Sequence, residues 1–314
     1  MSEDTQLNAG GSYLSGVNDD LLALLIVVTL AMLWWIEIRH PFLRPGLKAL
    51  KKSYLTNLGT FLFNDITLSL LSIPTLMIVA QHCAGYGLLA DMPDGPLKYG
   101  LTFVLLDLAM YGWHYLTHHN DALWVFHRVH HSDPVFNVTT GLRFHVGELV
   151  LEVLVRVAFI ALIGVSLGVV LVSQTVISMF VLFHHANIRF AGEEALSRVF
   201  IVPRLHRLHH SALRSEHDSN YGAVFSVWDR LFGTLQDRQP SDIGLAGVGQ
   251  QHFLDLLRYG LPDLLRSGGT WGLGNRLATL VRSGSYLPEP PTGSRAPLTV
   301  EGEAMEAPAV SADG

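Results

Sequence analysis

The chain has 314 residues, of which 49% are hydrophobic and 15% are charged, and its mean hydropathy is +0.32. This composition is typical of an integral membrane protein rather than of a soluble domain. The net charge of −6 gives no support for nucleic-acid binding, and the single cysteine, Cys83, excludes an internal disulfide and a cysteine-based zinc site.

The sequence of the N-terminal part indicates a polar segment followed by a first membrane span. Residues 1–20 contain no lysine or arginine, so we do not expect a cleaved signal peptide. Leu21 to Ile38 is a nearly unbroken apolar run, just long enough to cross a membrane. Five basic residues follow it: Arg39, Arg44, Lys48, Lys51 and Lys52. By the positive-inside rule this side is cytoplasmic, which puts the N-terminus outside.

Further apolar runs predict additional spans. Leu58 to Ala80 reads as a second span, Gln81 to Pro96 as an outer loop, and Tyr99 to Trp113 as a third span that returns inward. Leu149 to Phe183 is too long for one crossing, and Gly164 and Gly168 mark a break. We therefore expect two spans there, in a hairpin that enters and leaves on the cytoplasmic side.

Histidines recur at helical spacing beside these spans. His114 and His118 are four residues apart, and two sets at i, i+3 and i+4 follow: His127, His130 and His131, then His206, His209 and His210. Since residues three and four apart share a helix face, each set is expected to aim its imidazoles at one point. Imidazole is a ligand for zinc, iron, copper and nickel. Eight histidines exceed the four ligands of one zinc ion, so two metal ions fit the count better.

Other polar residues are candidates for supporting roles. His145 lies on one helix face with Glu148, and it is either an additional ligand or a group that orients a ligand. Asp218 and Asn220 follow the last histidine set, and they either hydrogen-bond ligand imidazoles or cap helices and turns. Asp107 precedes the first histidine pair and joins the candidates for orienting ligands.

The combined pattern resembles the membrane-bound fatty acid hydroxylase/sterol desaturase superfamily. The similarity rests on HxxxH, HxxHH and a later HxxHH, and it covers roughly residues 100 to 235. Short segments around these motifs also match: Asp107 ahead of WH, LW at Leu123–Trp124, HHS at His130–Ser132, RFH at Arg143–His145, FHHAN at Phe183–Asn187, PRLHRLHHS at Pro203–Ser211, DSNYG at Asp218–Gly222 and WDRLFGT at Trp228–Thr234. The motifs are specific for the superfamily but not for a substrate.

The resemblance implies a site and an activity. It implies that His185 is a further ligand, and that two iron ions activate O₂ with two external electrons to hydroxylate or desaturate a lipid, with hydroxylation the first choice. Zinc can replace iron in purified protein. Since no fused electron-transfer domain is recognisable, we expect a separate electron-donor protein; the other partners are the lipid substrate and the membrane, without nucleic acid.

The resulting fold class is an all-α integral membrane protein with four to five membrane-embedded helices and a cytosolic helical cap that holds a histidine-ligated di-metal site. We divide the chain into a polar N-terminal segment (1–20), N-terminal spans (21–98), a catalytic domain (99–240), an amphipathic or cap region (241–282) and a disordered tail (283–314). In this multi-pass topology the metal site and the C-terminus are cytoplasmic.

Two other functions compete with the oxygenase. A membrane metal-binding or transport protein requires ligands spread through the spans at membrane depth. The histidine sets here lie at span ends, which argues against it. A catalytically inactive scaffold would be favoured by a missing ligand, and none of the eight is missing.

Overall fold

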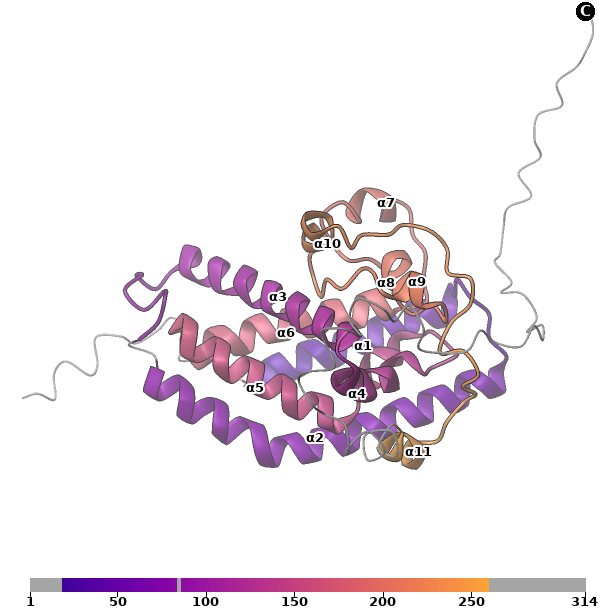
Figure 1. The fold of residues 1–314 in the computed structure, drawn as a ribbon, viewed down its shortest axis with the longest axis horizontal. Helices are drawn as coiled ribbons and strands as arrows, with labels where there is room; N and C mark the ends of the chain where they lie inside the picture. The colour runs from indigo at the N-terminus through magenta and orange to yellow at the C-terminus, as the bar shows by residue number, and fades with distance from the viewer. Residues whose placement is uncertain (1–18, 84–85, 260–314) are drawn as a thin grey trace, which may run out of the picture.

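The computed structural model describes residues 19–83 and 86–259. Over these ranges the chain is helical and contains two isolated β-bridges but no strand, so the predicted all-α class is confirmed. Five long helices lie side by side, and the short helices gather at one end of them (Figure 1). The expected N-terminal segment and C-terminal tail lie outside the described residues, apart from Asp19 and Asp20.

The long helices are α1 (Asp19–Arg39), α2 (Leu47–Cys83), α3 (Pro96–His119), α5 (Val146–Ile163) and α6 (Leu167–His185). Helix α2 packs along α5, and α1 packs along α6. By length and apolar composition, α1 from Asp20 and the whole of α6 can cross a membrane. A total of four to five membrane helices and a cytosolic cap stay predictions.

The predicted break between the last two long helices is confirmed at Gly164, whereas their insertion as two membrane spans stays a prediction. Helix α5 ends at Ile163, and Gly164 adopts the left-handed conformation with φ of 72°. A side chain there would place its Cβ 2.1 Å from the carbonyl oxygen of Tyr86, so only glycine fits. The backbone amide of Leu88 donates to Leu162, which fixes the loop after α2 against this turn. Gly168 lies inside α6 and does not break it.

Helix α2 is longer than the predicted span. Its 37 residues rise ~55 Å, well beyond a ~30 Å hydrocarbon core. The extra N-terminal turns carry the buried polar residues Ser53 and Asn57, which hydrogen-bond to the segment that follows α4 (Asp121–His131). The helix therefore joins a long apolar region to the structure around the histidines.

Helix α1 is held in place by a carboxylate that the sequence reading missed. Glu37 is 3% exposed and accepts hydrogen bonds from the backbone amides of Val138, at 2.8 Å, and Asn187, at 2.9 Å. Val138 begins the 3-10 helix η2 (Val138–Leu142), and Asn187 follows α6. A lone acidic residue in an apolar run is the signal that could have found it.

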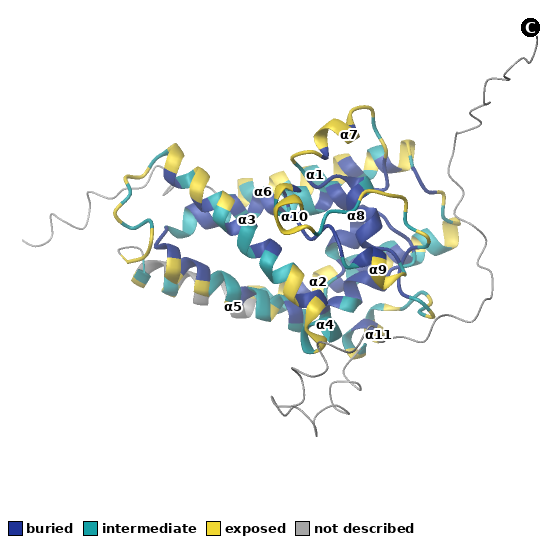
Figure 2. Cartoon of the chain, turned by 45° about the horizontal axis from the view of Figure 1, so that its top comes forward, coloured by how far each residue is buried: buried dark blue, intermediate teal, exposed yellow. Residues whose placement is uncertain are grey.

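The remaining elements are short and complete the histidine-rich end. They are α7 (Glu193–Leu196), α8 (Pro203–His209), α9 (Arg214–His217), α10 (Val227–Phe232) and α11 (Phe253–Arg258). Helix α8 is buried, whereas α7 and α10 carry exposed residues (Figure 2). Helix α11 packs on α2 and lies within the predicted amphipathic or cap region (241–282), of which residues 260–282 are outside the described part.

Candidate metal centre

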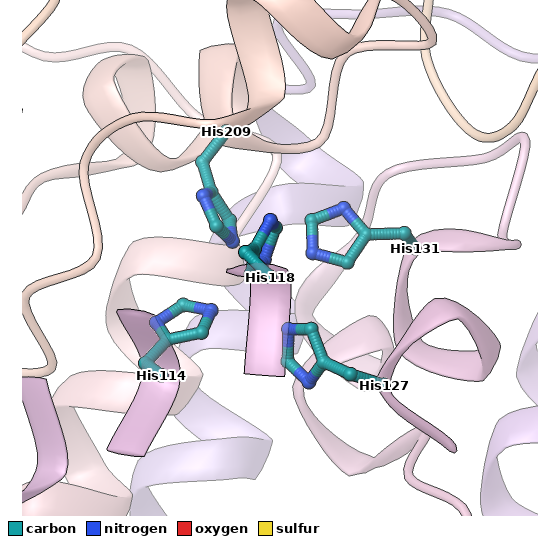
Figure 3. Close-up of side chains that lie close together, drawn as sticks. All are labelled: His114, His118, His127, His131 and His209. Carbon is teal, nitrogen blue, oxygen red and sulfur yellow. The ribbon is translucent and has the colours of Figure 1, made fainter. Parts of the chain in front are cut away.

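Nine buried or half-buried histidines converge in two groups within the described ranges. In each group the candidate ligand nitrogens lie within 4.8 Å of one another. The first group contains five histidines: His114, His118, His127, His131 and His209 (Figure 3). The second group contains four: His130, His185, His206 and His210. All eight histidines of the helical sets are therefore brought together, and His185 joins them.

The grouping differs from the expectation that each set points at one place. The i, i+4 pairs stay together, whereas the i+3 residue of each triplet turns to the other group: His130 leaves His127 and His131, and His209 leaves His206 and His210. At ~100° per residue, positions i and i+4 differ by about 40°, but i+3 and i+4 differ by about 100°. Each triplet therefore serves both groups.

Local sequence explains how the first group is placed. Helix α3 ends at His119. The side-chain oxygen of the next residue, Asn120, accepts hydrogen bonds from the amides of Ala122 and Leu123 and so caps α4. This cap separates the His114/His118 pair from the next triplet and lets the two helices pack against each other.

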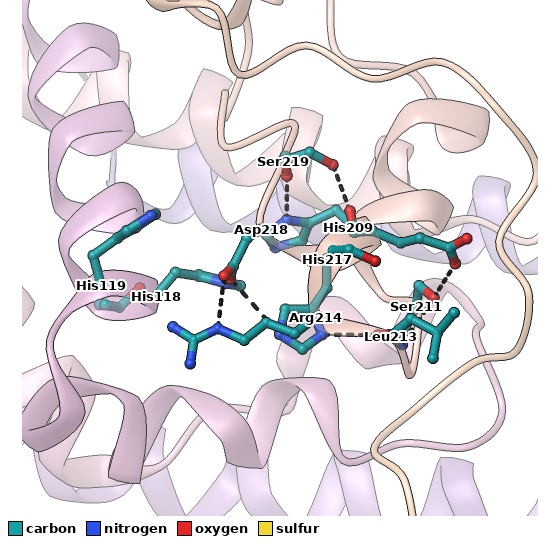
Figure 4. A network of polar contacts seen from close by, with 12 residues as sticks. His118, His119, His209, Ser211, Leu213, Arg214, His217, Asp218 and Ser219 are labelled. Carbon is teal, nitrogen blue, oxygen red and sulfur yellow. Dashed lines mark hydrogen bonds and ion pairs between the residues drawn. The ribbon is translucent and has the colours of Figure 1, made fainter. Parts of the chain in front are cut away.

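The imidazoles of the first group are oriented through their Nδ1 atoms. Nδ1 lies 2.8 Å from the Tyr221 carbonyl in His114, 3.2 Å from Asp218 Oδ1 in His118, 2.6 Å from Glu148 Oε1 in His127 and 2.6 Å from the Ser219 carbonyl in His209. Figure 4 shows the contacts of His118 and His209. A proton on Nδ1 serves each acceptor and leaves the lone pair on Nε2.

The Nε2 atoms of those four histidines have no hydrogen-bond partner among the described residues, and both ring nitrogens of His131 are likewise unpartnered. A buried polar atom without a partner is costly unless something else satisfies it. Burial holds the pKa of His131 and His209 well below 6.5, so these rings are neutral at pH 7. Buried, neutral imidazoles with inward lone pairs fit a metal ion.

The second group is more tightly arranged. His185 Nε2 lies 3.1 Å from His130 Nε2, 3.1 Å from His210 Nε2 and 2.9 Å from His206 Nε2. Its Nδ1 lies 2.7 Å from the Val181 carbonyl, to which it donates. Four nitrogens around a metal at ~2.0–2.1 Å would be about 3.3 Å apart in a tetrahedron, close to these separations. The donor set therefore fits a four-coordinate ion.

Two of the four residues expected to orient ligands do so: Glu148 and Asp218 contact His127 and His118. Asp107 instead accepts hydrogen bonds from Val224, Phe225 and Trp228. Asn220, whose φ is 56°, bonds to the backbone of Leu205 and Gln236. Both hold the segment after α9 in place, and through it the Tyr221 carbonyl that contacts His114.

His145 lies outside both groups. Its Nδ1 accepts the amide of Gly147 and so caps α5, and its Nε2 lies 3.3 Å from the Leu257 carbonyl. His184 also lies outside, with its ring centroid 3.9 Å from that of His206. The carbonyl groups of Tyr221, Ser219 and Arg143 that face ligand rings could not be found from the sequence, because every residue has a carbonyl.

A buried polar network supports the helix that carries His127, His130 and His131. Arg143 is 1% exposed and donates to the Val129 carbonyl, Asn57 Oδ1, Ser132 Oγ and Gln251 Oε1. Its own carbonyl lies 3.3 Å from His130 Nδ1. Asp133, also buried, accepts hydrogen bonds from Ser53, Asn57 and Thr140. The network thus joins α2, α4 and η2 at the metal centre.

Replacing Glu148 should weaken metal binding at the five-histidine group. Glu148→Ala removes the acceptor of the His127 Nδ1 proton, and changes of this kind cost about 10- to 100-fold in metal affinity. Glu148→Gln should lose less, because its amide oxygen can still accept. Chelator competition on purified protein measures both affinities.

The matched control is Glu152→Ala, one helical turn along α5, where the carboxylate pairs with Arg156 and contacts no histidine ring nitrogen in the described structure. Glu152→Ala should leave the metal affinity of the five-histidine group unchanged. An equal loss in Glu152→Ala and Glu148→Ala would contradict the assigned role.

Comparison with known proteins agrees with this geometry. The family model described as fatty acid hydroxylase matches residues 99–234. Ornithine lipid hydroxylase OlsE of Rhizobium tropici is 34% identical over 158 residues, which is 49% of this chain and 47% of that protein. Alkylglycerol monooxygenase is 25% identical over 233 residues in Danio rerio (70% of this chain, 51% of that protein) and 28% identical over 143 residues in Homo sapiens (46% and 32%).

The aligned part therefore spans about half or less of the length of each relative. No solved structure gives a significant match. The match of the family model begins three residues after the N-terminus of α3 and ends two residues after α10, so it contains all nine grouped histidines. Residues 99–234, less than half of the chain, therefore form a fatty acid hydroxylase domain.

Proposed function

We propose that this chain is a membrane-bound di-iron oxygenase that hydroxylates a C–H bond of a lipid, using O₂ and electrons from a separate redox protein. The observation that carries the proposal is the set of histidines whose ligand nitrogens gather in two groups. In the five-histidine group the Nε2 atoms have no hydrogen-bond partner among the described residues, and in the four-histidine group the Nε2 atoms face one another. A fatty acid hydroxylase domain around that set supports an oxidoreductase.

The histidines have a definite part in this chemistry. Bound iron would supply the oxidising power for an unactivated C–H bond, which no side chain provides and redox-inert zinc cannot. The five-histidine and four-histidine groups would each hold one ion. Glu148 and Asp218 keep a proton on Nδ1 of His127 and His118, so that Nε2 stays available as the ligand atom.

A lipid substrate is supported by the position of the centre. His185 is the last residue of α6, one of the two helices that can cross a membrane, and it belongs to the four-histidine group. A C–H bond of a lipid within the bilayer could therefore approach the centre from the membrane side. The names of the relatives, an ornithine lipid hydroxylase and alkylglycerol monooxygenases, favour hydroxylation over desaturation.

The test is oxygen incorporation from ¹⁸O₂. Iron-loaded protein, a chemical or protein reductant and a mixed lipid extract are incubated under ¹⁸O₂, and the lipids are compared by mass spectrometry. Hydroxylation adds one labelled oxygen, whereas desaturation removes two hydrogens and adds no label. Folded, iron-loaded protein that changes no lipid in any reductant would argue for a metal-binding or transport protein instead.

We also propose that the end of the bundle opposite the histidines faces outside. Cys83 ends α2 near the loop that contacts the Gly164 turn, whereas His118 and His185 lie at the other ends of α3 and α6.

In intact cells a membrane-impermeant maleimide should label Cys83. In a Cys83→Ser background, Gln239→Cys, at an exposed position, should react only after permeabilisation. The reverse pattern would overturn the orientation, and labelling of both sites in intact cells would overturn the span count.

A further inference from the structure

A polar pocket lies beside the two histidine groups, and none of the grouped histidines lines it. It has a volume of about 500 Å³ and is formed by the segment after α6, by α7 and by α8. Three arginines line it: Arg189, Arg204 and Arg207. Glu193 and Glu194 line it too, so the pocket is polar rather than a channel for an acyl chain.

Arg207 is the unusual member of this lining. It is 1% exposed, and its Nε, Nη1 and Nη2 atoms have no hydrogen-bond partner in residues 19–83 and 86–259. A guanidinium group carries five N–H donors and stays charged in proteins, so a buried one without acceptors is costly. Either a ligand accepts hydrogen bonds from the Arg207 guanidinium, or burial of this charge destabilises the folded protein.

Neighbouring aromatic rings fix the orientation of this guanidinium. Its central carbon lies 4.1 Å from the ring centroid of Phe42 and 5.9 Å from that of Phe136. Cation–π contacts of this kind use the face of the guanidinium and leave the N–H groups at its edge available. A planar, preorganised fork of N–H donors matches the oxygen atoms of phosphate or carboxylate.

Two of the other charged residues of the pocket, Arg204 and Glu193, are already engaged. Arg204 forms an ion pair with Asp237, and its backbone amide donates to Glu193 Oε1 at 2.8 Å. No ion pair within 4.0 Å joins Arg207 to Glu193 in the described structure, although the two attract each other at longer range. Arg207 is thus the donor with capacity for an added anion, and exposed Arg189 adds positive charge.

With α1 and α6 as membrane spans, the pocket would lie near the lipid headgroups. Residues 189–194 follow α6 by a few residues, and Phe42 follows α1 by three residues. Both helices can cross a membrane, and both end on this side of the molecule (Figure 1). We propose that this pocket is an oxyanion-binding site, with Arg207 as its principal donor, for a phosphate or carboxylate group of a lipid headgroup or of a free anion.

The proposal is tested by binding, so it does not depend on the oxygenase activity. The full chain is purified in an uncharged detergent and titrated calorimetrically with inorganic phosphate, with short-chain phosphatidic acid and with diacylglycerol of the same chain length. We expect the wild type to bind at least one phosphate-containing probe and to bind diacylglycerol more weakly. Arg207→Gln should weaken phosphate-dependent binding by about 10- to 100-fold, the range for charge-assisted hydrogen bonds.

Two further variants make the result specific. Arg198→Gln removes the same charge at an exposed position outside the pocket and should bind like the wild type. Arg189→Gln should weaken binding by a smaller factor than Arg207→Gln, and it serves if the buried variant does not fold. Stronger binding of phosphatidic acid than of phosphate assigns a lipid headgroup, and equal binding assigns a free anion. No preference of the wild type for either phosphate probe over diacylglycerol, or equal binding by folded Arg207→Gln, would overturn the proposal.

Discussion

His206→Ala should lower the iron content of the purified protein from about two ions per chain to about one, and it should abolish lipid oxidation. His206 is one of four histidines in its group, and its Nε2 lies 2.9 Å from His185 Nε2, so its removal leaves three ligands. Because loss of groups that only orient ligands costs about 10- to 100-fold, loss of a direct ligand should exceed about 100-fold in metal affinity.

His209→Ala should affect the other group, although His209 is only three residues away. Four histidines remain around that ion, so we expect a smaller loss of iron than in His206→Ala but an equally complete loss of activity. Elemental analysis and the ¹⁸O₂ assay measure both effects. The spectrum of the remaining iron tells which ion each variant has lost. If His206→Ala and His209→Ala lost the same ion, the assignment of His206 and His209 to different groups would be wrong.

His119→Ala is the matched control for these changes. His119 adjoins His118, but it is exposed, its Nδ1 contacts the Tyr115 carbonyl at 2.9 Å, and its ring stacks on Tyr115. It should keep both iron ions and full activity. A loss of iron in His119→Ala as large as that in His206→Ala would mean that any histidine in this region, rather than the grouped ones, supports the metal content.

The sequence predicted the features of the centre that depend on local spacing. Pairs at i, i+4 and the break at Gly164 are short-range properties of a helix and its ends. It could not divide the triplets, because the side to which His130 and His209 turn depends on how α4 and α8 pack. It also missed backbone acceptors such as the Tyr221 carbonyl. Asp107 accepts hydrogen bonds from backbone amides instead of an imidazole, and Asn220 follows the second of its two predicted alternatives, a role in a turn.

Arg143→Ala should destabilise the protein by about 3–5 kcal/mol, the range for breaking a buried charged network. The change removes four donated hydrogen bonds and leaves Asn57 Oδ1, Ser132 Oγ, Gln251 Oε1 and the Val129 carbonyl with fewer donors in a buried region. At ~2–4 °C per kcal/mol, the melting temperature in detergent should fall by roughly 10 °C. Arg198→Ala, an equal change at an exposed site, should shift it by less than about 2 °C.

The same variant should act on the metal centre through His130. The Arg143 carbonyl faces His130 Nδ1, and its side chain holds the Val129 carbonyl next to that histidine in the chain. If Arg143 orients α4 as well as stabilising the fold, iron at the four-histidine group should be removed by a chelator at least about tenfold faster than in the wild type, at a temperature where both proteins are folded. Unchanged iron release together with a large fall in melting temperature would restrict Arg143 to a structural role, because the fold would then tolerate its loss without moving His130.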